Sequence, residues 1–248
     1  MKRTLGISLI AASVVVIAGA ATGDLQKLIG MEEPLSERDI AIAEGKKAYN
    51  NNIPKAYRIL LPYAEKKDPD AQAYVGLVLA REFFGINGRR GSAARGWGSM
   101  PRDKERGIAM LKTSAKEGSA AGKFHLGIYY RGGANKVPRN EARGWQLIDE
   151  AANLGHLPAQ EQLFLFYFIS ADDLREKNER DKRISYFAKS YKWARLLYEC
   201  TSGRHKLVWK ARIEHEFHDH MVLSRARVVK LGENLVSQWK KKQGRACL

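Results

Sequence analysis

Apolar residues recur at intervals of three and four along the chain from about residue 36 onward. Ile108, Leu111 and Ala115 show this spacing, and residues 147, 148, 151 and 152 show it again. Such spacing places apolar side chains on one face of a helix. Alternating runs rich in Val, Ile and Thr, which strands require, are missing from the sequence. Short segments with Gly, Pro and Asn separate the apolar stretches. The pattern therefore predicts an all-α protein.

The predicted helices repeat. Residues 105–111 align with residues 142–148, and residues 114–118 align with residues 151–155, with an offset of 37 residues in both cases. A period in the thirties with paired helices is typical of an α-solenoid, in which each pair buries its apolar face against the next.

Glycines stand at two kinds of place in this repeat. Gly118 and Gly155 come one turn after small residues, where a helix ends and a left-handed residue is favoured. Gly76 and Gly127 lie inside predicted helices, where glycine costs about 1 kcal/mol relative to alanine. Close helix–helix crossings at Gly76 and Gly127 would offset that cost.

The motifs resemble those of the Sel-one-like repeat family, a relative of the tetratricopeptide repeats. They are Leu-Gly-Ile-Tyr-Tyr-Arg-Gly-Gly at 126–133, Val-Pro-Arg-Asn at 137–140 and Ala-Ala-Asn-Leu-Gly at 151–155. The resemblance is most specific over 120–160, good over 39–119 and weaker after 160. It implies a right-handed α/α superhelix of about four helix pairs. It also implies a binding role, since relatives act as assembly factors, export-complex parts, regulators and host-contact proteins.

The first 23 residues have the layout of a secretory signal. Lys2 and Arg3 precede an uncharged apolar run at 5–17, and small residues follow at 18–21. The run is shorter than the ~20 residues that a membrane-spanning helix needs, which favours a cleaved signal over an uncleaved anchor. We therefore expect a periplasmic or secreted protein whose mature chain begins near 21–24.

The remaining chain divides into a predicted solenoid, 36–203, and a predicted helical cap, 204–248. The cap carries eleven Lys and Arg against four Asp and Glu. We expect its apolar face to consist of Ala226, Val229, Leu231, Leu235 and Trp239. Lys240, Lys241 and Lys242 either bind an anionic surface, such as that of a membrane, or simply suit the end of a helix dipole.

An insertion interrupts the solenoid. The distance from Gly76 to Gly127 is 51 residues, 14 more than the period, and the excess lies within 83–101. Insertions in solenoids become loops on one face, often the binding face. The predicted partner-binding residues are the basic and aromatic ones, Arg89, Arg90, Arg95 and Trp97. The alternative is a loop without a partner.

The formal net charge of +16 favours anionic partners. Because export disfavours nucleic acid, we expect a protein or an anionic glycan. Cys200 and Cys247 are the only cysteines, and an oxidising compartment allows a disulfide between them. Whether they meet stays open at this stage.

Motifs for chemistry are weak. The histidine cluster at 215–220 lacks the spacing of a zinc protease and a third ligand, so we predict no metal. No nucleophile elbow or phosphate loop occurs, and we predict no catalytic residue and no cofactor. The favoured function is a non-enzymatic adaptor. The alternatives are an enzyme acting on cell-wall polymer and a structural subunit of an envelope assembly.

Overall fold

The computed structural model describes residues 36–80, 100–133, 137–175, 179–219 and 225–244. These residues form helices and no strand, which confirms the all-α prediction. The helices are α3 (Glu37–Tyr49), α4 (Ile53–Glu65), α5 (Pro69–Ala80), α6 (Lys104–Lys116), α7 (Ala120–Gly132), α8 (Glu141–Asn153), α9 (Leu157–Asp172), α10 (Arg180–Cys200), α11 (Gly203–Asp219) and α12 (Arg225–Gln243). The chain divides into two compact units, 1–41 and 42–248.

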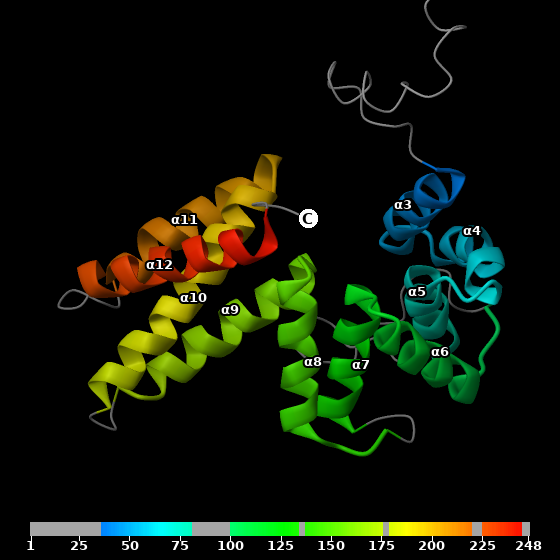
Figure 1. The fold of residues 1–248 in the computed structure, drawn as a ribbon, viewed down its shortest axis with the longest axis horizontal. Coiled ribbons are helices and arrows are strands. Elements are labelled where there is room, and N and C mark those ends of the chain that lie inside the picture. Colours follow the sequence, from blue (N-terminus) through cyan, green and yellow to red (C-terminus); the bar gives the residue numbers. More distant parts are fainter. Residues whose placement is uncertain (1–35, 81–99, 134–136, 176–178, 220–224, 245–248) are drawn as a thin grey trace, which may run out of the picture. The chain divides into compact units, whose positions relative to one another are not determined.

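Consecutive helices of the second unit pack against one another (Figure 1). The closest pairs are α5 with α6, α7 with α8, and α9 with α10. Further contacts join α6 to α7 and α8 to α9, and α5 also contacts α7. Contacts between successive helices, with a contact between the first helices of two neighbouring pairs (α5 and α7), are those of stacked helix hairpins, so the arrangement is solenoid-like. No helix in the described ranges is long and apolar enough to cross a membrane.

The helix starts repeat in backbone detail. The N-cap residues of α4, α6 and α8 are Asn52, Asp103 and Asn140. Their backbone angles are almost the same, with φ of −150°, −144° and −144° and ψ of 88°, 89° and 90°. Each side chain accepts a hydrogen bond from the backbone N–H three residues on. The first two N-caps are 51 residues apart and the next two are 37 apart, as the sequence offsets predict.

The helix ends repeat as well. Gly118 and Gly155 follow α6 and α8 with φ of 92° and 85°, which confirms the predicted left-handed positions. Lys67 holds the equivalent place after α4 with φ of 64°, the only positive φ of a non-glycine residue in the described segments. The same backbone turn thus closes three alternate helices, α4, α6 and α8.

Glycine pairs mark the closest helix crossings. A Cβ on Gly76 would lie 2.7 Å from the carbonyl oxygen of Gly107, and one on Gly127 would lie 2.8 Å from that of Gly144. Real Cβ atoms do not approach an oxygen so closely, so a side chain there would push the helices apart. This confirms the close crossings predicted for Gly76 and Gly127, within the α5–α6 and α7–α8 pairs.

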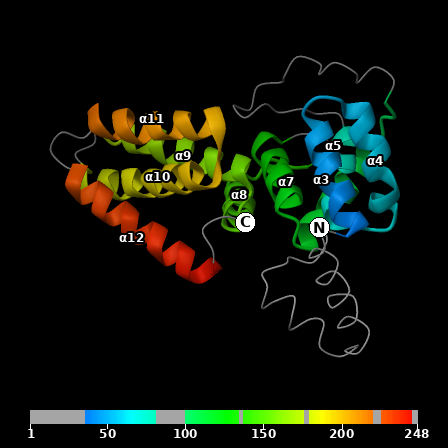
Figure 2. The same ribbon diagram turned by 90° about the horizontal axis from the view of Figure 1, so that it is seen from above.

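The α10, α11 and α12 helices close the C-terminal part. Figure 2 shows α11 and α12 beside α10, and both contact it. Ion pairs join Asp181 to Arg227 (2.9 Å), Arg195 to Glu233 (3.1 Å) and Glu199 to Lys240 (2.7 Å). Because both partners advance along the chain together, α10 and α12 run in the same direction.

The predicted apolar face of α12 was partly wrong. Trp239 is buried as expected, and Val229 and Leu235 are partly buried, but Ala226 and Leu231 are exposed. The face turned to the core is formed by Val228, Gly232, Val236 and Trp239. Gly232 sets this face because the ring of Tyr191 contacts the helix where a Cβ would stand. Hydropathy does not mark a glycine as a packing position.

Candidate functional site

The predicted binding residues Arg89, Arg90, Arg95 and Trp97 lie outside the described residues. Cys200 ends α10, while Cys247 also lies outside the described residues, so their pairing stays a prediction. The candidate site described next comes from other residues, which the sequence analysis did not single out.

Four aromatic and imidazole rings form a continuous line across successive helices, here named the ring ladder. The ring centroids of Tyr49 and Tyr74 are 5.2 Å apart, those of Tyr74 and His125 are 6.2 Å apart, and those of His125 and His156 are 6.3 Å apart. Phe124 packs beside the last two, with its ring 5.1 Å from His125 and 4.8 Å from His156. The ladder therefore joins four elements that are distant in sequence.

The repeat explains why these rings meet. Tyr49 ends α3, Tyr74 lies in α5, His125 lies in α7, and His156 is the N-cap of α9. Tyr74 and His125 are 51 residues apart, the same offset as Gly76 and Gly127, so they hold equivalent positions in neighbouring repeats. Stacking of the first helix of each pair places equivalent side chains next to one another.

The two histidines are neutral at physiological pH. Burial lowers the pKa of His125 to about 4. Burial, together with the charges of His125 and Lys46, lowers the pKa of His156 to about 3. Removal of water disfavours the charged imidazole, which is the cause in both cases. The ladder accordingly presents uncharged rings.

Two polar atoms of the ladder have no hydrogen-bond partner among the described residues. They are the phenol oxygen of Tyr49 and Nδ1 of His156, both buried. Buried polar atoms are ordinarily hydrogen-bonded, and an unsatisfied one costs about 1–3 kcal/mol. Burial also raises the pKa of Tyr74 to about 12, so its phenol stays a neutral donor and acceptor. These groups suit hydrogen bonding to an uncharged polar ligand such as a peptide backbone.

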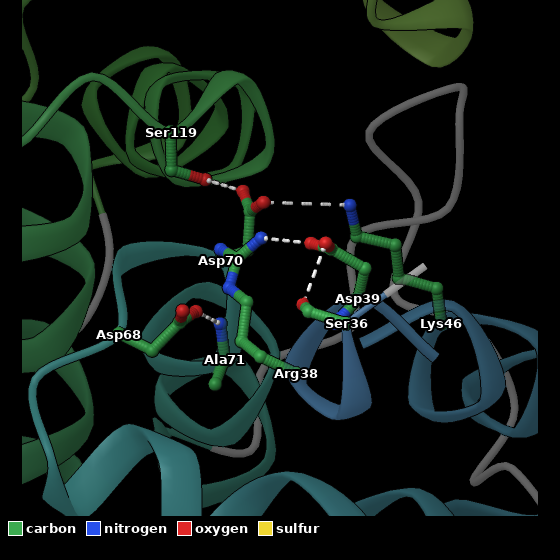
Figure 3. Close-up of polar contacts among 8 residues, drawn as sticks. All are labelled: Ser36, Arg38, Asp39, Lys46, Asp68, Asp70, Ala71 and Ser119. Carbon is green, nitrogen blue, oxygen red and sulfur yellow. Dashed lines mark hydrogen bonds and ion pairs between the residues drawn. The ribbon is translucent and has the colours of Figure 1, made fainter. Parts of the chain in front are cut away.

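Figure 3 shows a polar cluster around Asp70. The carboxylate of Asp70 accepts a hydrogen bond from Ser119 Oγ at 2.8 Å and lies 3.6 Å from Lys46 Nζ. Asp68 holds the start of α5 by accepting from the Ala71 N–H at 2.9 Å. The charge of Asp70 contributes to the raised pKa of Tyr74, while Lys46 acts on His156. Charged groups therefore flank uncharged rings.

In the described part of the chain, no group of three or more His, Cys, Asp or Glu is placed to hold a metal ion. His215 is exposed on α11, and His220 lies outside the described residues. An enzyme acting on a cell-wall polymer would be indicated by a cluster of carboxylates with shifted pKa values. Partial burial raises the pKa values of Asp149 and Glu161, but they lie on α8 and α9, and each has basic neighbours.

Sequence reasoning missed the ring ladder although one signal was present. The 51-residue offset aligns Tyr74 with His125, two ring side chains at one repeat position. Tyr49 and His156 sit at helix ends outside that register, so only the folded arrangement brings them into line.

Comparison with protein-family models and with curated proteins gives no match for this chain.

Proposed function

We propose that the protein is an exported, non-enzymatic scaffold of the Sel-one-like repeat type, which holds an extended segment of a partner protein along the ring ladder. The observation that carries the proposal is the unbroken line of neutral rings from α3 to α9, with buried polar atoms that need partners.

The spacing of the ladder suits an extended peptide. In an extended chain, side chains on the same face recur about every 6.6 Å. The ring-to-ring distances of 5.2, 6.2 and 6.3 Å are close to that repeat. Alternate side chains of a bound segment would therefore meet successive rings. Its backbone groups would meet the polar rings of Tyr74 and His125, which are partly exposed.

The proposal is tested by selecting ligands from a displayed library of random dodecapeptides. Affinity of a selected peptide is then measured by calorimetry for the parent, Tyr74→Ala and His125→Ala. We expect each ladder variant to weaken binding at least tenfold, since aromatic anchors carry much of the energy of an interface. The matched control is His215→Ala, which removes an exposed histidine from α11. Equal affinity of both ladder variants and the parent would contradict the proposal, provided that circular dichroism shows the same helix content.

Export is tested separately. The mature protein should be recovered from the periplasm or medium, beginning near residues 21–24, because the layout at 2–21 is that of a cleaved signal. Amino-terminal sequencing decides this. Recovery of soluble protein that still begins at Met1 would refute export while leaving the ring ladder untouched.

A further inference from the structure

A second group of rings, separate from the ring ladder, lies beside Arg131 in the last turn of α7. Arg131 Cζ lies 3.7 Å from the centroid of the Trp145 ring, so the guanidinium group stacks on the indole. Trp145 packs in turn on Phe166, with ring centroids 4.2 Å apart. Arg131 Nη1 donates a long hydrogen bond to Gln162 Oε1 at 3.4 Å. These contacts hold one cation where α7, α8 and α9 meet.

Comparison of two repeats shows that the fold does not require an arginine at this position. Arg131 holds the place that Ala80 holds 51 residues earlier, in the preceding helix pair. A Cβ on Gly107 would meet the Ala80 Cβ, and a Cβ on Gly144 would meet the Arg131 Cγ. The two residues therefore cover equivalent helix crossings, and alanine is large enough to do so. The charge at the end of the Arg131 side chain is not needed for the crossing.

The guanidinium of Arg131 forms no ion pair with any residue that the structure describes. Its Nε is buried without a hydrogen-bond partner, whereas Nη2, which also lacks a partner there, is not buried. Partial burial lowers the pKa of Arg131, although the nearby Glu141 acts in the opposite direction. Glu141 itself is exposed and pairs with Arg139 at 3.4 Å. An anion that reaches Nη1 and Nη2 would offset the cost of burying this charge.

We propose that Nη1 and Nη2 of Arg131, held in place by the stack on Trp145, bind a carboxylate group of a peptide. A stacked guanidinium presents its N–H groups in one plane, where they can donate to both oxygens of a carboxylate. One guanidinium balances the single charge of a carboxylate, and the nearby Glu141 disfavours a dianion such as phosphate.

The choice of a peptide as the ligand rests on the proposed function, whereas the carboxylate site itself does not involve the ring ladder. The carboxylate belongs either to an acidic side chain or to the C terminus of the peptide. Both sources share one chemistry, and the experiments separate them.

The site is tested first with acetate, at constant ionic strength and with chloride as the competing ion. Binding is followed by the NMR signal of the Trp145 indole N–H, which should shift in a saturable way. We expect Arg131→Lys to weaken acetate binding by about fivefold or more, because lysine keeps the charge but lacks the planar fork. The matched control is Arg143→Lys on α8, since Arg143 is exposed and lies 3.9 Å from Glu150. Equal acetate affinity in the parent and Arg131→Lys, or an equal loss in the control, would overturn the proposal.

Two further variants separate loss of the site from loss of folding. Arg131→Ala should abolish acetate binding and keep the helix content of the parent, since Ala80 fills the equivalent place. Gln162→Glu should weaken acetate binding by about tenfold or more, because it offers the guanidinium a carboxylate from within the protein. Circular dichroism checks the fold of both variants. Parental acetate affinity in either folded variant would overturn the proposal.

The source of the carboxylate follows from three acetylated tripeptides. Acetyl-Gly-Glu-Gly-amide has only a side-chain carboxylate, acetyl-Gly-Gly-Gly has only a terminal one, and acetyl-Gly-Gln-Gly-amide has none. The tighter binder of the first two identifies the source. Equally tight binding of the uncharged tripeptide, or tighter binding of inorganic phosphate than of acetate, would overturn the proposal. If the ring ladder proved not to bind peptide, acetate would still bind at Arg131, so the two failures are distinguishable.

Discussion

Lys67 adopts a backbone conformation that glycine adopts at the equivalent positions after α6 and α8. Its φ of 64° matches the left-handed turn of Gly118 and Gly155. A residue with a Cβ pays about 1–2 kcal/mol for this conformation, whereas glycine adopts it without that penalty. The strain at Lys67 is visible only when the three turns are compared.

We expect Lys67→Gly to raise the free energy of unfolding by up to about 1 kcal/mol, because the strain of the left-handed turn is relieved. The measurement is urea denaturation at neutral pH. The control is Lys66→Gly, one residue earlier, where φ is −77° and glycine brings only its entropic cost. A loss of stability in Lys67→Gly equal to that of the control would show that the turn is not strained.

Single residues also show which structural roles can be predicted from the sequence. The roles of Gly76, Gly118, Gly127 and Gly155 followed from spacing, because glycine has few reasons to occur at such positions. The packing role of Gly232 did not, since it depends on the ring of Tyr191 from another helix. Contacts that join distant segments leave no local pattern.

At the scale of helices, the N-caps of α4, α6 and α8 have the same local structure. Asn52, Asp103 and Asn140 share one backbone geometry and one side-chain hydrogen bond, with N···O distances of 3.0, 2.9 and 3.0 Å. Helix type and the 37-residue repeat could be predicted because these local rules recur. The ring ladder could not, because its order depends on how four helices stack.

Replacing any one of these N-caps with alanine should lower the free energy of unfolding by about 1 kcal/mol, since each supplies an acceptor to an otherwise unpaired N–H. The three losses should agree closely because the geometry is the same. Chemical denaturation followed by circular dichroism measures them. Asn51→Ala, at the exposed residue beside the first N-cap, serves as the control. A cap variant as stable as this control would contradict the prediction.

At the scale of the whole molecule, the neutral histidines link stability to pH. His125 and His156 have folded-state pKa values of about 4 and about 3, against an ordinary value of 6.5. Between pH 6.5 and pH 4 the unfolded chain therefore binds more protons than the folded one, so the folded state loses stability as pH falls. Above pH 6.5 the contribution is complete.

Lowering the pH from 7 to 5 should reduce the free energy of unfolding by about 2 kcal/mol for each of these histidines. Urea midpoints at the two pH values test this. The double variant His125→Gln and His156→Gln should lose most of that pH dependence, whereas His215→Gln, at an exposed site, should keep it. Equal pH dependence in the parent and the double variant would refute the assignment.

Charge acts over the same scale. If the basic insertion contributes to binding, Arg89→Ala, Arg90→Ala and Arg95→Ala combined should weaken binding of the selected peptide and flatten its salt dependence, because salt shortens the Debye length from ~10 Å at 0.1 M to ~3 Å at 1 M. Calorimetry at both salt concentrations measures this. The helix content should be unchanged. If the triple variant bound the peptide at low salt with the affinity of the parent, the insertion would not take part in binding.

The backbone hydrogen bond that joins the two helices of a pair forms with connections of different length. The Asp103 N–H donates to the Leu79 carbonyl at 3.1 Å, and the Asn140 N–H donates to the Tyr130 carbonyl at 2.8 Å, although the first connection is 14 residues longer than the second. Both connections begin and end at the same kind of backbone hydrogen bond between the paired helices. New sequence placed between them alters what the protein displays without altering how it is built. Connections of different length and sequence can therefore be exchanged at this junction, by evolution or by engineering.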